Sequence, residues 1–262
     1  MRRQAIKNKI DIMKKTTLLS LILSVCYLNI AKAEIGKGKS NPWIDIGLKG
    51  SYGITSLYNN NLLNEKNLQH SLSTGYSGGL KLGFNLNTVL ALNIEAVMNQ
   101  LGQKYQGTHQ DFRDWKNNVK LNYFEFPVLL KITKNEWSFV ELGIKTSMLK
   151  EAIDSEGDVS NFFNNSNFSV IFGFGQTLFA TNGFYVSMGP RFTYGFSDLI
   201  SENGKAANFP FPAGKFGSAS AVQEYKPTNS ISASMQLNID FDLGQLAKAS
   251  CGRGSKFVLF KN

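Results

Sequence analysis

The sequence has little cysteine and little histidine, with two of each among 262 residues. Cys26 lies in a segment that we expect to be removed as a leader, so Cys251 remains alone and an intrachain disulfide is excluded. Catalytic and metal sites built on histidine need further polar groups, and the sequence places no such cluster with His70 or His109. We therefore predict no catalytic residue, no metal ligand and no cofactor.

Long apolar runs are also scarce. The one stretch of helical length, residues 16–30, follows Lys14 and Lys15 and ends at the small-residue pattern of residues 31–33. A basic start, a short apolar centre and an A-x-A end are typical of a secretory signal peptide. We expect residues 1–33 to be cleaved.

Two details refine this expected leader, and two alternatives compete with it. Met13 is the expected initiator, and Glu34 the expected first residue of the mature chain. A membrane anchor is disfavoured because the apolar run is short for a spanning helix. A lipoprotein signal would use Cys26, but Val25 is large for the position before a lipidated cysteine.

The positive charge is concentrated in the same leader. The chain carries +9, and residues 1–33 hold seven basic residues and one acidic residue, which leaves only +3 for the mature chain. A strongly basic surface is the electrostatic signature of nucleic-acid binding. The sequence therefore gives no support for a nucleic-acid partner.

The mature chain contains segments in which apolar and polar residues alternate. From Ser230 to Phe241 every second residue is apolar and the others are polar. Successive side chains of a strand point to opposite faces, so this segment has one apolar face and one polar face. Its length fits a tilted strand that crosses a bilayer. No later segment could span as a helix, so a membrane location requires a closed barrel, because an open sheet would leave backbone groups unpaired in lipid.

Eight segments share this period. We expect strands near 43–54, 75–86, 89–101, 120–133, 137–148, 167–179, 184–197 and 230–241. The fifth strand is the weakest prediction, because Trp137 and Phe139 fall on its polar face. Pro127 and Pro190 lie inside strands, where each removes a backbone donor and so predicts a bulge or a local break in pairing.

The links between these strands alternate in length. Long links are expected at 55–74, 102–119, 149–166 and 198–229, and short ones at 87–88, 134–136 and 180–183. This rhythm is typical of an all-β, eight-stranded antiparallel up-and-down transmembrane barrel with short periplasmic turns and long extracellular loops. The barrel would occupy residues 34–241, and residues 242–262 would form a periplasmic tail.

A water-soluble barrel of the lipocalin kind, which binds an apolar ligand inside, has the same period with its faces reversed. Three features favour the outer membrane. The leader directs export, the polar face is rich in Gly, Ser and Asn, and aromatic residues lie near strand ends where interfacial girdles occur. These residues are Trp43, Tyr52, Tyr76, Tyr123, Trp137, Tyr185 and Tyr194.

Three segments carry a resemblance to a family: Ile46–Tyr52, Tyr76–Gly83 and Tyr123–Lys131. They resemble strands of the small outer-membrane β-barrels of Bacteroidota, the group that includes PorT-like proteins. The resemblance implies a barrel without a cofactor, and some relatives serve type IX secretion and gliding motility. The chain departs from the usual pattern after Phe241, because a tail follows the expected terminal aromatic residue.

Charged residues occur at intervals on the polar face of the strands, and we expect them to lie in the lumen. Because eight strands enclose an interior that side chains fill, these charges should form a structural network of ion pairs rather than an ion or proton path. The set is Lys49, Lys81, Lys131, Lys145, Arg191, Asp45, Glu95, Glu125, Glu141 and Asp240.

The expected outer loops hold three further candidates. His70, with Ser71 and Ser73, is the basis for an alternative function as a lipid-modifying enzyme, although its spacing does not match outer-membrane hydrolases. The acidic run 154–158 imperfectly resembles a calcium loop, and a solvated turn is the simpler interpretation. The Phe-rich segment 208–217 would either bind a partner or fold back over the barrel mouth.

These observations favour a small, non-enzymatic outer-membrane barrel. Its partners would be the surrounding lipid and proteins that contact the outer loops or the tail. A structural or interaction role in a secretion or surface assembly is the expected function.

Overall fold

The computed structural model describes residues 44–59, 68–107, 115–134, 137–180, 184–207, 209–210 and 226–243. They all belong to one compact unit of the chain. The expected leader, Cys26, His109, Cys251 and the tail beyond Leu243 lie outside the described residues. None of the helices in the described ranges is long and apolar enough to cross a membrane.

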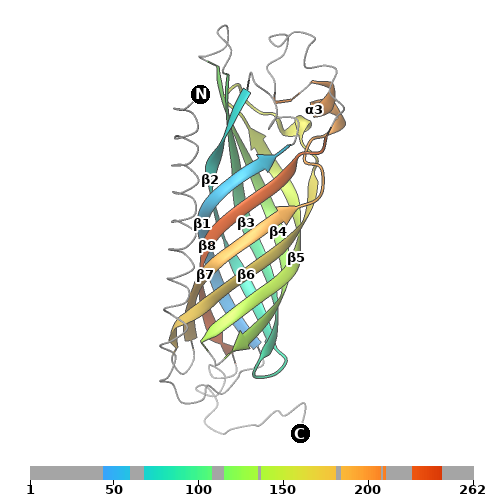
Figure 1. Ribbon diagram of the computed structural model, residues 1–262. Coiled ribbons are helices and arrows are strands. Elements are labelled where there is room, and N and C mark those ends of the chain that lie inside the picture. The colour runs from blue at the N-terminus through green and yellow to red at the C-terminus, as the bar shows by residue number, and fades with distance from the viewer. Residues whose placement is uncertain are drawn as a thin grey trace, which may run out of the picture. The chain divides into compact units, whose positions relative to one another are not determined.

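Eight antiparallel strands form a closed barrel in sequential order, as predicted (Figure 1). The strands are β1 Ile44–Tyr58, β2 Leu68–Asn85, β3 Leu90–Gly107, β4 Lys116–Lys134, β5 Ser138–Ile153, β6 Ser166–Ala180, β7 Phe184–Gly195 and β8 Asn229–Asp242. Two short helices, η2 Ser160–Phe162 and α3 Glu202–Ala206, lie in the links after β5 and β7.

The first and last strands close the ring. β1 pairs with β8 without interruption from Asp45 opposite Asp242 to Tyr58 opposite Asn229. Phe241 lies opposite Ile46 and, on its other side, opposite Phe184 at the start of β7. The segment that shows the clearest alternation in the sequence is therefore the closing strand.

Short and long links alternate around the barrel, as predicted. The strand ends that the short links 86–89, 135–137 and 181–183 connect lie at one end of the barrel, which we call the short-turn end. The strand ends that the long links 59–67, 108–115, 154–165 and 196–228 connect lie at the opposite end, the long-loop end. β1 starts and β8 finishes at the short-turn end (Figure 1).

Several strands reach further towards the long-loop end than predicted. β2 begins at Leu68 rather than 75, and β3 continues to Gly107 rather than 101. His70, predicted to lie in a loop, is in β2 opposite Tyr105. Near the long-loop end the outward residues of β2 and β3 become polar, so the apolar–polar alternation in the sequence weakens. The backbone hydrogen bonds between the strands do not depend on side-chain type, so the strands continue.

Both strand prolines interrupt a ladder, as predicted. The β3–β4 pairing has a gap beside Pro127 between the pairs Ile94–Val128 and Val97–Glu125. The β6–β7 pairing has a similar gap beside Pro190. In each case the register is the same on both sides of the gap, so the proline causes a local break rather than a bulge.

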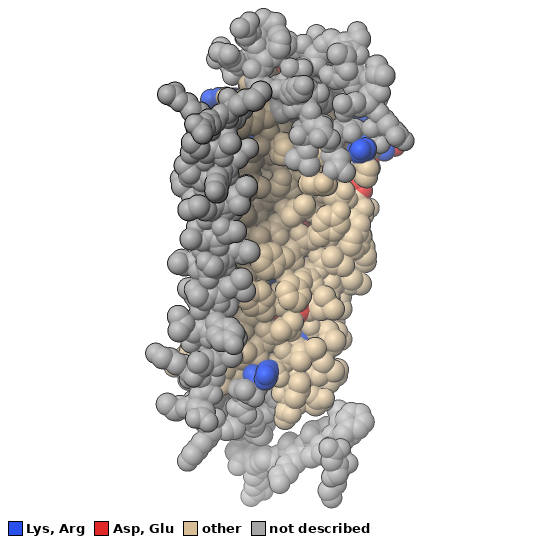
Figure 2. All heavy atoms as spheres, in the orientation of Figure 1, with Lys and Arg blue, Asp and Glu red and all other residues tan. Residues whose placement is uncertain are grey.

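Through the middle of the barrel, the polar face of each strand points inwards and the apolar face points outwards. On β4 the outward positions are apolar from Phe124 to Ile132, nine residues of strand, which suits a tilted bilayer crossing. Figure 2 shows a mostly uncharged surface over β5 to β8. This arrangement is the reverse of a soluble lipocalin-type barrel, so that alternative is wrong.

The fifth strand is confirmed, and the structure shows where the two aromatic residues on its predicted polar face lie. Trp137 lies in the turn before β5, and Phe139 is buried inside the barrel at 3% exposure. Phe139 breaks the polar pattern because its ring contacts the Lys131 ammonium, with 4.3 Å between Nζ and the ring centroid.

We predict that Gly79→Ala lowers the free energy of unfolding by about 1–3 kcal/mol, through overpacking against β3. A Cβ at Gly79 would meet the Ala96 carbonyl oxygen and lie 2.7 Å from Cα of Val97. Gly78→Ala is the matched control, because its nearest neighbour, the Lys49 carbonyl oxygen, is 3.9 Å away. The measurement is the urea midpoint of the folded-barrel band in cold gel electrophoresis. Equal midpoints for the two variants would contradict the prediction.

Candidate functional site

The charged residues predicted to face the lumen are all inside it. Each of the five cations and five anions is buried, with at most 8% of its surface exposed. Asp242 at the end of β8 is a further buried acid. The barrel wall positions these side chains because each is the inward member of an alternating strand.

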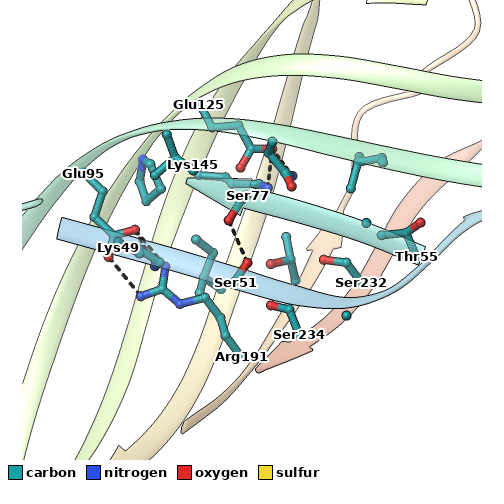
Figure 3. A pocket seen from close by; sticks show the side chains of 18 of the residues that line it. Lys49, Ser51, Thr55, Ser77, Glu95, Glu125, Lys145, Arg191, Ser232 and Ser234 are labelled. Carbon is teal, nitrogen blue, oxygen red and sulfur yellow. Dashed lines mark hydrogen bonds and ion pairs between the residues drawn. The ribbon is translucent and has the colours of Figure 1, made fainter. Parts of the chain in front are cut away.

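Arg191 of β7 is the centre of the network. Its guanidinium donates two hydrogen bonds to Glu95 of β3, at 2.8 and 3.0 Å, and one of 2.6 Å to Glu141 of β5. Lys49 of β1 shares the Glu95 carboxylate at 2.8 Å, and the Gln236 amide of β8 donates to Glu141 at 3.1 Å. Five strands are thus tied together across the lumen. Figure 3 shows the part of the network formed by Lys49, Glu95 and Arg191.

A second cluster lies nearer the long-loop end. Lys145 of β5 pairs with Glu125 of β4 at 2.6 Å. The same carboxylate accepts hydrogen bonds from the Asn99 amide at 2.9 Å and the Ser147 hydroxyl at 3.2 Å. All three contacts are made by one Glu125 oxygen, Oε1, and such partners make a buried carboxylate tolerable.

A third cluster fills the short-turn end. Lys81 of β2 forms an ion pair with Asp240 of β8. Asp45 accepts hydrogen bonds from the Tyr185 hydroxyl at 2.6 Å and the Asn85 amide at 2.9 Å. Lys131 lies over the rings of Phe139 and Tyr185, so its charge is partly met by cation–π contacts.

Between the first two clusters the lumen retains a cavity of about 40 Å³. Its walls include Lys49, Lys145 and small hydroxyl residues such as Ser51, Ser77 and Ser232, seen in Figure 3. This volume has room for a few water molecules at most. The small size of the cavity fits the structural interpretation of the lumen.

An apolar cap closes the lumen at the long-loop end. Three inward residues of β4, Val119, Leu121 and Tyr123, are 0–2% exposed and pack in one buried cluster. The link after β5 adds Val159 and Phe163, and the link after β7 adds Leu199 and Ile200. We call this cluster, with its β1, β3 and β5 members, the apolar cap. Its remaining buried members are Leu57, Leu101, Tyr105 and Ala152.

The Phe-rich segment contributes to this cap where the structure describes it. The Phe209 ring lies 5.2 Å from Phe163 and 5.8 Å from Phe162, measured between centroids. Of the two predictions for this segment, folding over the mouth holds for Phe209. The part from residue 211 lies outside the described residues.

The acidic run after β5 forms a capped turn. The Asp154 carboxylate accepts from the amides of Glu156 and Gly157, and from the Asn117 side chain at 3.0 Å. Gly157 has φ of +142°, which favours glycine. Asp158 accepts from the hydroxyl and amide of Ser160, which lowers the pKa of its carboxyl. Within the described ranges, no group of three or more His, Cys, Asp or Glu is arranged to hold a metal ion.

A groove of about 310 Å³ lies beside this turn. The aromatic residues Trp115, Phe162 and Phe209 line it together with the acidic residues Asp154, Glu156 and Asp158. The groove combines apolar and acidic walls at the long-loop end.

His70 has no catalytic neighbourhood in the described part of the chain. No hydrogen bond there joins it to Ser71 or Ser73. Ser73 is buried in the wall and Ser71 is exposed, so the two hydroxyls lie on different faces. His109 lies outside the described residues.

The sequence analysis missed the cap. The signal was present on β4, where the inward positions change from charged to apolar between Glu125 and Tyr123. In this part of β4 the polar and apolar faces exchange places, because the outward residues Lys120 and Asn122 are polar where Leu121 and Tyr123 point inwards.

We predict that Arg191→Met lowers the free energy of unfolding by about 3–5 kcal/mol, because it leaves Glu95 and Glu141 with fewer buried partners. Adding Glu141→Gln should recover part of this loss, since Lys49 still pairs with Glu95. The measurement is the urea midpoint of the folded-barrel band. Lys205→Met, which removes an exposed ion pair with Glu202, should change stability by less than about 1 kcal/mol. An additive effect of the two lumen substitutions would contradict the prediction.

Solved structures of similar shape come from several bacteria. Neisserial surface protein A is 12% identical, with a TM-score of 0.42, and the match covers 76% of this chain and 97% of that one. The outer membrane protein OprG from Pseudomonas aeruginosa is 10% identical, with a TM-score of 0.40 and coverage of 77% and 96%. Ail of Yersinia pestis, solved with the heparin analogue sucrose octasulfate, is 9% identical, with a TM-score of 0.36 and coverage of 76% and 99%.

No curated protein matches the sequence. A family model described as "Outer membrane protein beta-barrel domain" matches residues 41–201, more than half of the chain. The matched segment runs from the start of β1 through β7, and the eighth strand of the same closed ring follows it. The chain therefore belongs to the outer membrane protein beta-barrel domain family and is a small β-barrel protein of the outer membrane.

Proposed function

We propose that this protein is a non-enzymatic barrel that acts through its extracellular loops as a structural or interaction component of the cell surface. The observation that carries the proposal is the closed lumen. Ion pairs fill its centre and short-turn end, and the apolar cap fills its long-loop end. We infer from this filling that no solute path crosses the described barrel and that function resides in the loops and the outer wall.

The orientation follows from the link lengths. Outer-membrane barrels have short periplasmic turns and longer extracellular loops. The short-turn end would therefore face the periplasm, and the apolar cap with its groove would face the cell exterior.

Side-chain hydrogen bonds hold the described part of the links after β5 and β7 in place. The turn 154–158 is held by side-chain caps, and the Ser201 hydroxyl bonds to the Asn161 carbonyl at 2.6 Å, joining the two long links. The Asn164 amide adds bonds of 2.9 and 3.1 Å to the carbonyls of Asp198 and Ile200. A preorganised surface loses less entropy when a partner binds.

The resemblance to PorT-like barrels suggests the kind of assembly. The segments that carry it lie in β1, β2 and β4, so they specify the wall rather than a partner. A role in a secretion or surface assembly would reside in the loops or in the predicted periplasmic tail.

The closed lumen predicts that the purified protein gives no steady ionic current in a planar lipid bilayer. The ion pairs and the cap leave no continuous aqueous path, because eight strands enclose only side chains. The measurement is single-channel recording after insertion has been verified by the folded-barrel band. Stable current steps that scale with the number of inserted barrels would refute the closed lumen.

The interaction role predicts protein crosslinks from the groove in intact cells. A photoreactive amino acid at Glu156, which is exposed on the groove wall, should capture a specific protein. The same amino acid at Leu142, on the lipid-facing side of β5, is the control and should not capture that protein. Identical capture from both positions, or none from Glu156, would contradict an interaction role for the groove.

A further inference from the structure

Four lysines lie on the outer wall near the long-loop end. Lys104 belongs to β3, Lys116 and Lys120 to β4, and Lys150 to β5. All four are exposed, and the strand neighbours of Lys104 and Lys120 are buried, so these side chains point away from the lumen. We call these four residues the lysine patch.

The strand register brings the patch together. Lys104 lies opposite Asn118, so Lys116 and Lys120 are its diagonal neighbours on β4. Such diagonal pairs are about 7–8 Å apart, within reach of long side chains. Lys150 belongs to the next strand, and its Nζ lies 5.9 Å from the centroid of the Phe124 ring. No ion pair within the described ranges involves any of the four lysines.

A row of hydrogen-bonded polar residues borders the lysine patch on its side towards the short-turn end. The Gln100 amide of β3 donates to Asn122 of β4 at 3.1 Å, and the Asn122 amide donates to Glu151 of β5 at 3.0 Å. Immediately towards the short-turn end, the outer wall of β4 becomes apolar at Phe124 and stays so to Ile132. The row therefore lies where the lipid hydrocarbon would end.

The patch lies at and just beyond this row. In the strand segments that carry the patch, 100–106, 116–122 and 149–153, the one acid is Glu151, whose carboxylate is already engaged by Asn122. The acidic turn 154–158 adjoins the same part of β4 through Asn117 and Asn118. Lysine side chains next to hydrocarbon extend their ammonium groups towards the headgroup layer, and ammonium groups bind phosphate well. Like charges at this spacing repel one another unless an anion lies between them.

We propose that the lysine patch binds the phosphate groups of a phosphorylated glycolipid in the outer leaflet. The proposal rests on the orientation proposed above, in which the long-loop end faces the exterior. It assigns a headgroup site to one side of the barrel, over β3, β4 and β5, and so gives the barrel a preferred face towards charged lipid.

The test uses the full-length mature barrel in phosphatidylcholine vesicles with and without lipid A. Lipid A should raise the temperature at which the folded-barrel band is lost. The triple variant Lys104→Gln, Lys116→Gln and Lys120→Gln should abolish most of this rise, and each single substitution should weaken lipid A binding about fivefold. The rise should also shrink at high salt.

Lys134→Gln is the matched control for Lys120→Gln. Both lysines are exposed on β4, but Lys134 is at the short-turn end. The control should respond to lipid A as the unmodified protein does. A full response in the triple variant would overturn the lysine patch. Loss of the response in Lys134→Gln alone would also overturn it, because lipid A would then bind at the short-turn end.

The two proposals fail in different ways. A protein that inserts and gives the folded-barrel band, yet shows no stabilisation by lipid A, refutes the lysine patch and leaves the interaction role standing. An equal rise produced by inorganic phosphate in plain vesicles would also refute the lipid assignment.

Discussion

The need to pair every backbone polar group within the hydrocarbon layer governs this structure. A sheet in lipid meets that need only by closing on itself, and here β1 and β8 close it along their whole length. Closure with eight strands leaves an interior that side chains must fill. The narrow lumen, its paired charges and its apolar cap all follow from that one constraint.

Inside the barrel, the charges are tolerated because they are shared. Glu95 forms ion pairs with both Lys49 and Arg191, and Arg191 also pairs with Glu141. One guanidinium therefore neutralises acids from two strands. Buried ion pairs add little net stability over apolar packing, but losing one partner is costly. The network therefore joins strands that are not neighbours in the ring and occupies the centre of the lumen.

The two proposed binding surfaces lie on the outer wall and at the long-loop end. The apolar cap joins the links after β5 and β7 into one surface with a groove, and the lysine patch lies on the wall below it. Binding to proteins and binding to charged lipid would thus use different faces of the same end. Neither requires movement of the barrel.

The sequence by itself determined the architecture, because the side-chain period of a strand is local and its apolar face is compulsory in lipid. Eight strands, the link rhythm, the breaks at Pro127 and Pro190, and the ten lumen charges could all be predicted residue by residue. Only the tertiary structure decided which charges pair, because Arg191 and Glu95 are brought together by barrel closure rather than by sequence spacing. It likewise decided that Tyr123 and Phe163 share a cap, that His70 lies in a strand, and that Lys104 and Lys120 are neighbours, since register between strands is set by pairing and not by any single strand.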